Sequence, residues 1–106
     1  IAPKPGTDGA LAMAMMNVII EEGLVDRDYV DNHTVGYEPL AERAKTCTPA
    51  WAEKITGVPA ADIRRFAREY ATTPPAAIRL GVALERNYGG SQAIRAVTCL
   101  PALIGA

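Results

Sequence analysis

The sequence predicts an α/β fragment that is mostly helical, with one or two short strands. An apolar stretch near the start covers every face of a helix, and later segments repeat apolar residues at helical spacing. A short apolar run then leads into a glycine-rich loop, which indicates a strand. The chain has 106 residues, of which 49% are hydrophobic and 22% charged, a composition ordinary for one folded domain.

The first helix is expected over residues 8–22. Gly23 follows it, where many helices end in a left-handed conformation that a residue without a Cβ adopts at least cost. Because apolar side chains occur on every face of this stretch, we expect the helix to lie inside a larger core. A short second helix should follow, with Asp26 as its N-cap and Tyr29 and Val30 turned inward.

The next two helices are predicted to open on proline, whose fixed φ suits the first helical position. Pro39 leads a helix to about Lys45, and Thr48 caps a helix that starts at Pro49 and ends near Gly57. A clearer helix follows over residues 59–71. Its inward side chains recur at helical spacing: Ile63, Phe66, Ala67 and Tyr70. Its charged side chains form a solvated face: Arg64, Arg65, Arg68 and Glu69.

The remainder of the chain is predicted to run from a strand through a loop into a last helix. Pro74 and Pro75 end the helical region because neither can donate the bond that a continuing helix needs. Residues 76–80 are expected to form a short strand that runs into Gly81, and residues 85–90 a loop. Ser91 is predicted to cap the final helix, whose apolar side chains are Ile94, Val97, Leu100 and Leu103.

A first candidate site comprises Gly6, Thr7 and Asp8, at the start of the first helix. The start of a helix exposes unpaired N–H groups that can bind an anionic or polar ligand. A fixed carboxylate can also accept parallel hydrogen bonds from the ring N–H and the exocyclic amine of guanine. The alternative is that Thr7 or Asp8 is simply an N-cap.

A second candidate site lies between the predicted strand and the last helix, where ligands bind in open α/β folds. Gly81 would let a ligand approach the backbone, and Arg86 carries a planar fork of donors suited to phosphate or carbonyl groups. The alternative is that the glycines serve turns and that Arg86 is a solvated loop charge.

Charge and composition exclude several classes of ligand. Eleven basic and twelve acidic residues give a net charge of −1, so nothing draws the chain to nucleic acid or an anionic membrane. The apolar run of residues 10–20 is too short to span a membrane. Cys47, Cys99 and His33 do not amount to a ligand set for zinc or an iron–sulfur cluster, so no metal ligand and no catalytic residue is predicted.

Five ordered blocks of the sequence resemble the catalytic subunit of the molybdopterin oxidoreductases, the dimethyl sulfoxide reductase family. The blocks are Pro5-Gly6-Thr7-Asp8 with Ala10-Leu11-Ala12; Val18 to Leu24; Tyr29-Val30 with His33-Thr34 and Gly36-Tyr37; Ile55 to Ala60 with Ile63-Arg64; and Arg79-Leu80-Gly81 with Arg86 and Arg95-Ala96. The resemblance extends over the whole chain, and ordered blocks are more specific than either candidate site alone.

The resemblance implies a segment, residues 1–106, of a dinucleotide-binding-like α/β domain, truncated at both ends. This domain type holds a bis(molybdopterin guanine dinucleotide) cofactor with molybdenum or tungsten. The family motif falls on Gly6, Thr7 and Asp8, with Asp8 toward guanine. A second cofactor contact falls on Leu80, Gly81 and Arg86. Where relatives often show Arg-His-Thr-Asn-Gly-Gly, this chain has Arg-Asn-Tyr-Gly-Gly-Ser from residue 86.

By the same resemblance, the parent enzyme catalyses two-electron redox chemistry or oxygen-atom transfer. Its metal ligand and iron–sulfur cluster lie outside this segment, so we expect the fragment itself to be inactive and to bind no cofactor. Expected partners are the rest of the catalytic subunit and an iron–sulfur electron-transfer subunit, and the isolated fragment is expected to self-associate through exposed apolar faces. Either the cytoplasm or the periplasm suits the sequence. The competing hypothesis is a small helical interaction module without a cofactor.

Overall fold

The computed structural model describes residues 1–106 and consists of helices joined by short connections. In chain order these are α1 (Asp8–Glu21), α2 (Arg27–His33), α3 (Tyr37–Ala44), α4 (Pro49–Thr56), α5 (Ala60–Thr72), a 3₁₀ turn η1 (Leu84–Arg86) and α6 (Gly90–Ile104). The predicted α-helices are confirmed, with boundaries that agree to within about two residues. None of the helices has both the length and the apolarity needed to cross a membrane.

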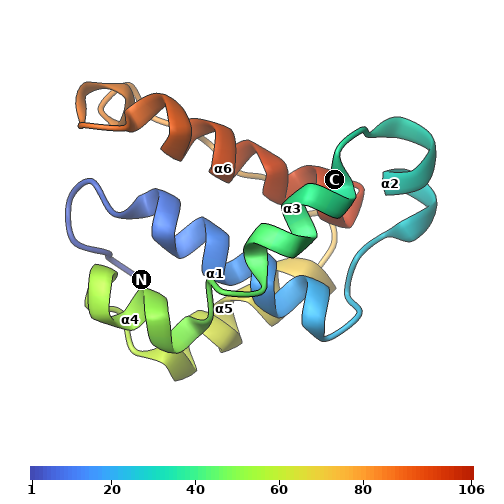
Figure 1. The fold of residues 1–106 in the computed structure, drawn as a ribbon, viewed down its shortest axis with the longest axis horizontal. Coiled ribbons are helices and arrows are strands. Elements are labelled where there is room, and N and C mark those ends of the chain that lie inside the picture. Colours follow the sequence, from blue (N-terminus) through green and yellow to red (C-terminus); the bar gives the residue numbers. More distant parts are fainter.

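Helices α1 and α6 lie side by side and run in the same direction (Figure 1). At their N-terminal ends the two backbones approach closely: a Cβ added to Gly9 would lie 3.2 Å from the Cα of Ala93. At their C-terminal ends the N–H of Asp26, just past α1, donates to the carbonyl of Leu103 at 2.8 Å. Both helices therefore point their N-termini, with positive dipole ends, at the same side of the molecule.

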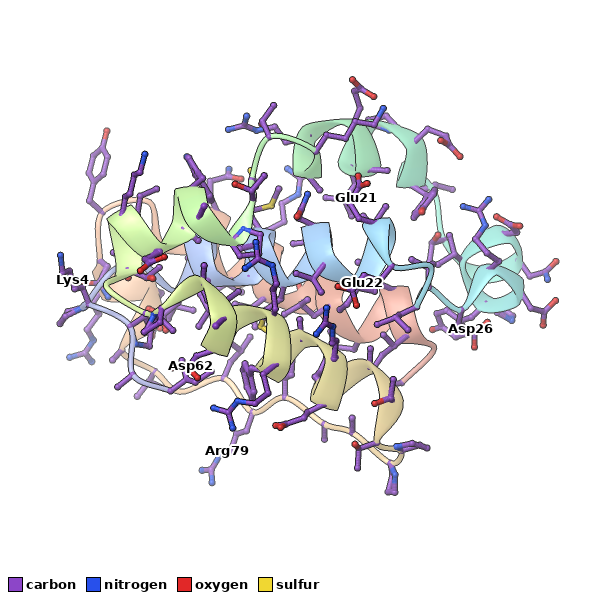
Figure 2. All side chains as sticks on the ribbon, turned by 90° about the horizontal axis from the view of Figure 1, so that it is seen from below. Lys4, Glu21, Glu22, Asp26, Asp62 and Arg79 are labelled. Atoms are coloured by element: carbon purple, nitrogen blue, oxygen red, sulfur yellow. The ribbon has the colours of Figure 1, made fainter.

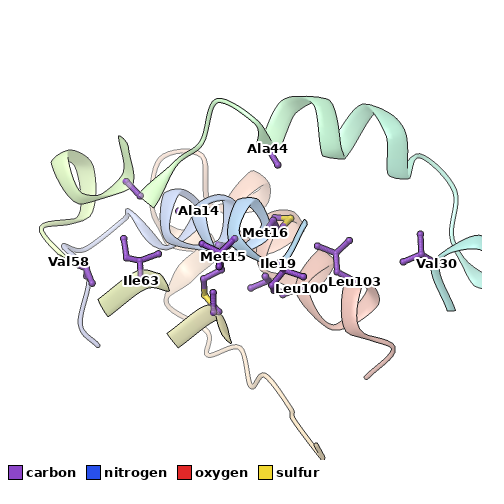
Figure 3. Close-up of a cluster of buried hydrophobic side chains, with 14 residues drawn as sticks. Ala14, Met15, Met16, Ile19, Val30, Ala44, Val58, Ile63, Leu100 and Leu103 are labelled. Atoms are coloured by element: carbon purple, nitrogen blue, oxygen red, sulfur yellow. The ribbon is translucent and has the colours of Figure 1, made fainter. Parts of the chain in front are cut away.

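The core forms around α1, as its apolar faces predict. Met16 and Ile19 of α1 are fully buried and lie close to Leu100 and Leu103 of α6 (Figure 3). Helices α3, α4 and α5 cover the rest of α1. The one polar side chain buried on α1, Asn17, donates from Nδ2 to the carbonyl of Ala44 at 3.1 Å, so its amide is satisfied where α3 ends.

The predicted strand at residues 76–80 is wrong. The chain is extended there but forms no strand, and none of the backbone N–H groups from residues 76 to 82 donates a hydrogen bond within the chain. A strand exists only through hydrogen bonds to a neighbouring strand, and this chain supplies none. Only Ile78 packs against the core from this stretch, so local sequence alone favoured the strand.

The predicted cap of the last helix also differs. The N-cap of α6 is Gly89, in the left-handed conformation at φ +73°, and no side chain caps this helix. Ser91 lies one residue inside the helix with an exposed side chain. The turn η1 brings the chain back over the start of α6, so a left-handed glycine supplies the reversal and Ser91 falls too late to act as a cap.

Candidate functional site

The first candidate segment, Gly6 to Asp8, forms a tight turn at the N-terminal end of α1. The N–H of Lys4 donates to the carbonyl of Thr56 at 2.9 Å, which ties this turn to the end of α4. Gly6 has φ +77°, a left-handed conformation that favours glycine, so the residue type predicted for the turn is the one the backbone needs. The segment is thereby fixed to the helical core at both ends.

The side chains of this turn leave the start of α1 without a cap. Thr7 occupies the N-cap position, but its hydroxyl donates to the carbonyl of Lys4 at 2.6 Å and does not cap the helix. Asp8 is the first residue of the helix, and its half-buried carboxylate has no hydrogen bond or ion pair within the chain. A half-buried carboxylate at a positive helix end is suited to accept donors from outside the chain.

The structure brings the second candidate loop against the first. A Cβ on Gly6 would lie 3.5 Å from Oδ1 of Asn87, the residue that follows Arg86. The Asn87 amide in turn donates to the carbonyl of Ala83 at 3.2 Å, so the loop is braced internally. Arg86, on η1, is exposed and makes no ion pair. The turn of the first site and the part of the second loop that carries Arg86 thus meet at the common N-terminal end of α1 and α6 (Figure 1).

Gly90 allows this loop to pack against α6, a role that the sequence did not distinguish from that of the other glycines. Gly90 is buried, and a Cβ there would overlap the carbonyl oxygen of Leu84 and would lie 2.8 Å from the Cα of Glu85. The N–H of Gly90 donates to the carbonyl of Asn87 at 2.9 Å. The close packing of η1 on the start of α6 therefore requires glycine at this position.

Backbone donors remain free where the two turns meet. The N–H groups of Asp8 and Gly9 in α1, and of Ser91 in α6, donate to no acceptor of the chain. Such groups form the anion-binding end of a helix, and here two parallel helices present them side by side. The chemistry available is a set of fixed N–H donors beside one free carboxylate, which suits a ligand with both anionic and N–H groups.

Leu80 and Gly81 are not drawn into this cluster. Both lie exposed on the extended segment before η1, and a Cβ on Gly81 would have no atom within 4 Å. The neighbouring Arg79 points away from the helical core (Figure 2). The structure therefore gives contacts to the loop around Asn87 and none to the glycine that the strand-end argument selected.

The site also borders residues that the sequence analysis did not select. A cavity of about 800 Å³ opens beside the two turns and is lined by Gly6, Thr7 and Gly89 together with Gln92 and Arg95 of α6 and Arg43 of α3. Gln92, Arg95 and Cys99 recur at helical spacing on one face of α6, which is the signal that could have identified them.

The perturbed titratable groups lie elsewhere. Hydrogen bonds from Arg68 lower the pKa of the Glu22 carboxyl, and burial raises the pKa of Tyr70, whose hydroxyl has no hydrogen-bond partner. Cys47 is buried, with its Sγ 3.6 Å from the carbonyl oxygen of Arg43, and Cys99 lines the cavity. No cluster of three or more His, Cys, Asp or Glu side chains that could hold a metal forms.

The chain has clear relatives among enzymes. It is 42% identical to formate dehydrogenase H of Escherichia coli, matching 99% of this chain and 15% of the relative. It is 38% identical to the dimethyl sulfoxide reductase DmsA of Haemophilus influenzae, matching 96% of this chain and 15% of that protein. Among solved structures, acetylene hydratase from Pelobacter acetylenicus matches 97% of this chain and 14% of its own at a TM-score of 0.93 and 40% identity.

Two of these relatives, a formate dehydrogenase and a dimethyl sulfoxide reductase, are oxidoreductases. Formate dehydrogenases and dimethyl sulfoxide reductases are molybdopterin oxidoreductases, so the chain is homologous to a segment of that family and the resemblance seen in the sequence is confirmed. No protein-family model matches the chain. The chain spans about 15% of the length of the relatives that it matches.

Proposed function

We propose that residues 1–106 are the helical part of a cofactor-binding α/β domain in a molybdenum or tungsten oxidoreductase. In this proposal the segment holds the guanine nucleotide end of a bis(molybdopterin guanine dinucleotide) cofactor. When bound, that cofactor supplies two-electron redox or oxygen-atom transfer chemistry at its metal. The chain's own residues bind and orient the nucleotide end, and the metal ligand and the iron–sulfur centre belong to other parts of the enzyme.

The observation that carries the proposal is the meeting of the two turns. Gly6 and Asn87 lie far apart in the sequence yet in contact, which places Asp8 and Arg86 at one end of the parallel helix pair. A guanine presents adjacent N–H donors, and the unpartnered Asp8 carboxylate is their complementary acceptor. The free N–H groups of Asp8, Gly9 and Ser91 suit the anionic oxygens of a nucleotide.

The test is replacement of Asp8 in the full-length subunit. Asp8→Ala should weaken cofactor binding by about 1.5–3 kcal/mol, the range of hydrogen bonds to a charged group, which is roughly a ten- to hundredfold loss of affinity. Arg86→Ala should also lower cofactor retention. The measurement is molybdenum and guanine content per purified subunit, determined together with thermal unfolding.

Matched controls separate binding from helix stability. Asp62 is an acidic residue in the first turn of α5, where it pairs with Arg65, and Arg64 is an exposed cation on the same helix. Neither residue lines the cavity beside the two turns. Asp62→Ala and Arg64→Ala should leave guanine content unchanged. If Asp8→Ala leaves guanine content intact and lowers only the unfolding temperature, Asp8 is a helix-stabilising residue and the proposal fails for it. Equal effects of Arg86→Ala and Arg64→Ala would remove Arg86 from the site.

A further inference from the structure

The cavity beside the two turns has a size suited to a small molecule. Its volume of about 800 Å³ falls in the range of ligand pockets, about 300–1,000 Å³. Helices α1, α3, α4 and α6 contribute its walls. Met13, Leu40 and Trp51 supply apolar surface, and Thr7 and Gln92 supply polar groups near the helix starts.

The charged side chains that line this cavity are both arginines. Arg43 comes from α3 and Arg95 from α6, and no carboxylate lines the same space. Neither arginine takes part in an ion pair, whereas Arg27, Arg65 and Arg68 are all paired with carboxylates elsewhere. The cavity is therefore cationic without an internal counter-charge, which favours an anionic occupant.

The position of the arginines relative to the proposed nucleotide site narrows the choice of anion. Gly6, Thr7 and Gly89 line the cavity and also belong to the turns of the proposed site, so the cavity and the site are continuous. Arg95 lies roughly 7–8 Å along α6 from its first residue at a rise of 1.5 Å per residue. A ligand whose base lies at the turns would place its next groups along this wall.

We infer that Arg43 and Arg95 bind the diphosphate of the nucleotide, an inference that rests on the proposed function and adds two residues to the site. A guanidinium presents a planar fork of donors that matches phosphate oxygens in a bidentate arrangement. Two arginines from separate helices match the two negative charges of a diphosphate. Arg43 and Arg95 are both exposed, so their guanidinium groups are accessible to a ligand that enters the cavity.

The experiment measures binding of probes to the full-length subunit purified without cofactor. The probes are guanosine diphosphate, guanosine and inorganic pyrophosphate, each titrated calorimetrically. Arg43→Gln and Arg95→Gln remove the charge and keep an amide. Each should weaken guanosine diphosphate and pyrophosphate binding by about tenfold or more, the loss typical of a charge-assisted hydrogen bond, and leave guanosine binding unchanged. Arg64→Gln is the matched control and should change none of the three.

The outcomes separate this inference from the proposed function. If Asp8→Asn weakens guanosine binding while the arginine variants bind guanosine diphosphate normally, the guanine site stands and the diphosphate assignment is overturned. If the arginine variants lose pyrophosphate binding while Asp8→Asn has no effect on guanosine, the anion site stands and the guanine assignment fails. Equal losses for guanosine and guanosine diphosphate in the arginine variants, or no binding of pyrophosphate to the unmodified subunit, would overturn the inference. Circular dichroism of each variant confirms that it is folded.

Discussion

The two ends of the parallel pair of α1 and α6 differ in how their backbone groups are satisfied. At the C-terminal end, past α1, the N–H groups of Glu22, Gly23 and Leu24 all donate to carbonyls of α1, and Asp26 bonds to Leu103 of α6. At the N-terminal end, neither helix has a side-chain cap, and N–H groups of both helices lack a partner within the chain. Figure 2 shows Lys4 and Asp26 marking these opposite ends.

The difference indicates that one end of the helix pair is suited to ligand binding and the other to stabilising the fold. Unsatisfied helix ends cost stability unless water or a ligand takes their place, so an end left open by two adjacent helices is suited to binding. The closed end instead joins α1, α2, α5 and α6 through hydrogen bonds and the Glu22–Arg68 ion pair. We therefore expect substitutions at the closed, C-terminal end of the pair to change stability. At the open, N-terminal end, we expect a loss of stability only where a residue is in close contact with another part of the backbone.

Gly90→Ala should give the largest loss of stability among the substitutions considered for these two ends. The new Cβ would overlap the backbone of Leu84 and Glu85, which cannot move aside as a side chain can. We expect a loss of about 1–3 kcal/mol in the free energy of unfolding, as for overpacked sites. Urea denaturation of the purified protein measures it.

Gly81→Ala is the matched control for this substitution. Gly81 has a negative φ, and an added Cβ meets no atom within 4 Å, so its replacement should change the free energy of unfolding by less than about 0.5 kcal/mol. If both glycines tolerate alanine equally well, η1 does not pack against the start of α6 as the structure has it. A selective effect of Gly90→Ala shows that the open end depends on this backbone contact.

The contrast also shows how far the sequence could predict this molecule. Helices are local, so the apolar spacing of Ile63 and Ala67 and the cap at Thr48 were sufficient to place them, and both are confirmed. The prediction of a strand at residues 76–80 failed because a strand depends on hydrogen bonds to another strand that can lie far away in the sequence. Gly6 and Asp8 were selected from a motif, but their contact with Asn87 depends on the packing of α1 against α6. In the sequence, Arg95 could not be distinguished from other exposed charges, because only the fold shows that it lines the same cavity as Arg43.

Asp26→Ala tests the closed end directly. Oδ1 of Asp26 accepts the N–H of Tyr29 at 2.9 Å and caps α2, and loss of such a cap costs about 1 kcal/mol, within a range of about 0.5–2 kcal/mol. Asp26→Asn keeps an acceptor in place and should retain most of that stability. Thermal unfolding monitored by circular dichroism compares the two variants. If asparagine is as damaging as alanine, the carboxylate acts through its charge and not as a cap.

The smallest expected effect is a pH dependence at the same end. Arg68 donates from Nε and Nη2 to the two carboxylate oxygens of Glu22 at 2.7 and 2.8 Å, and these hydrogen bonds lower the pKa of Glu22 below its ordinary value of 4.5. Because the folded pKa is depressed, the pair contributes stability above about pH 4.5 and loses it as the pH falls through the folded value.

Glu22→Gln should therefore be less stable than the unmodified protein at pH 7, by a small margin because the pair is exposed to solvent. The difference should shrink below pH 4.5 and disappear once the pH falls through the lowered pKa of Glu22, where the unmodified protein also loses the carboxylate. Urea denaturation at several pH values between 7 and 3 measures the difference, with Glu21→Gln, which removes an exposed and unpaired neighbour, as the control. A difference that persisted unchanged at pH 3 would show that the glutamine disturbs the packing of α1 against α5, and that the ion pair adds nothing to the closed end.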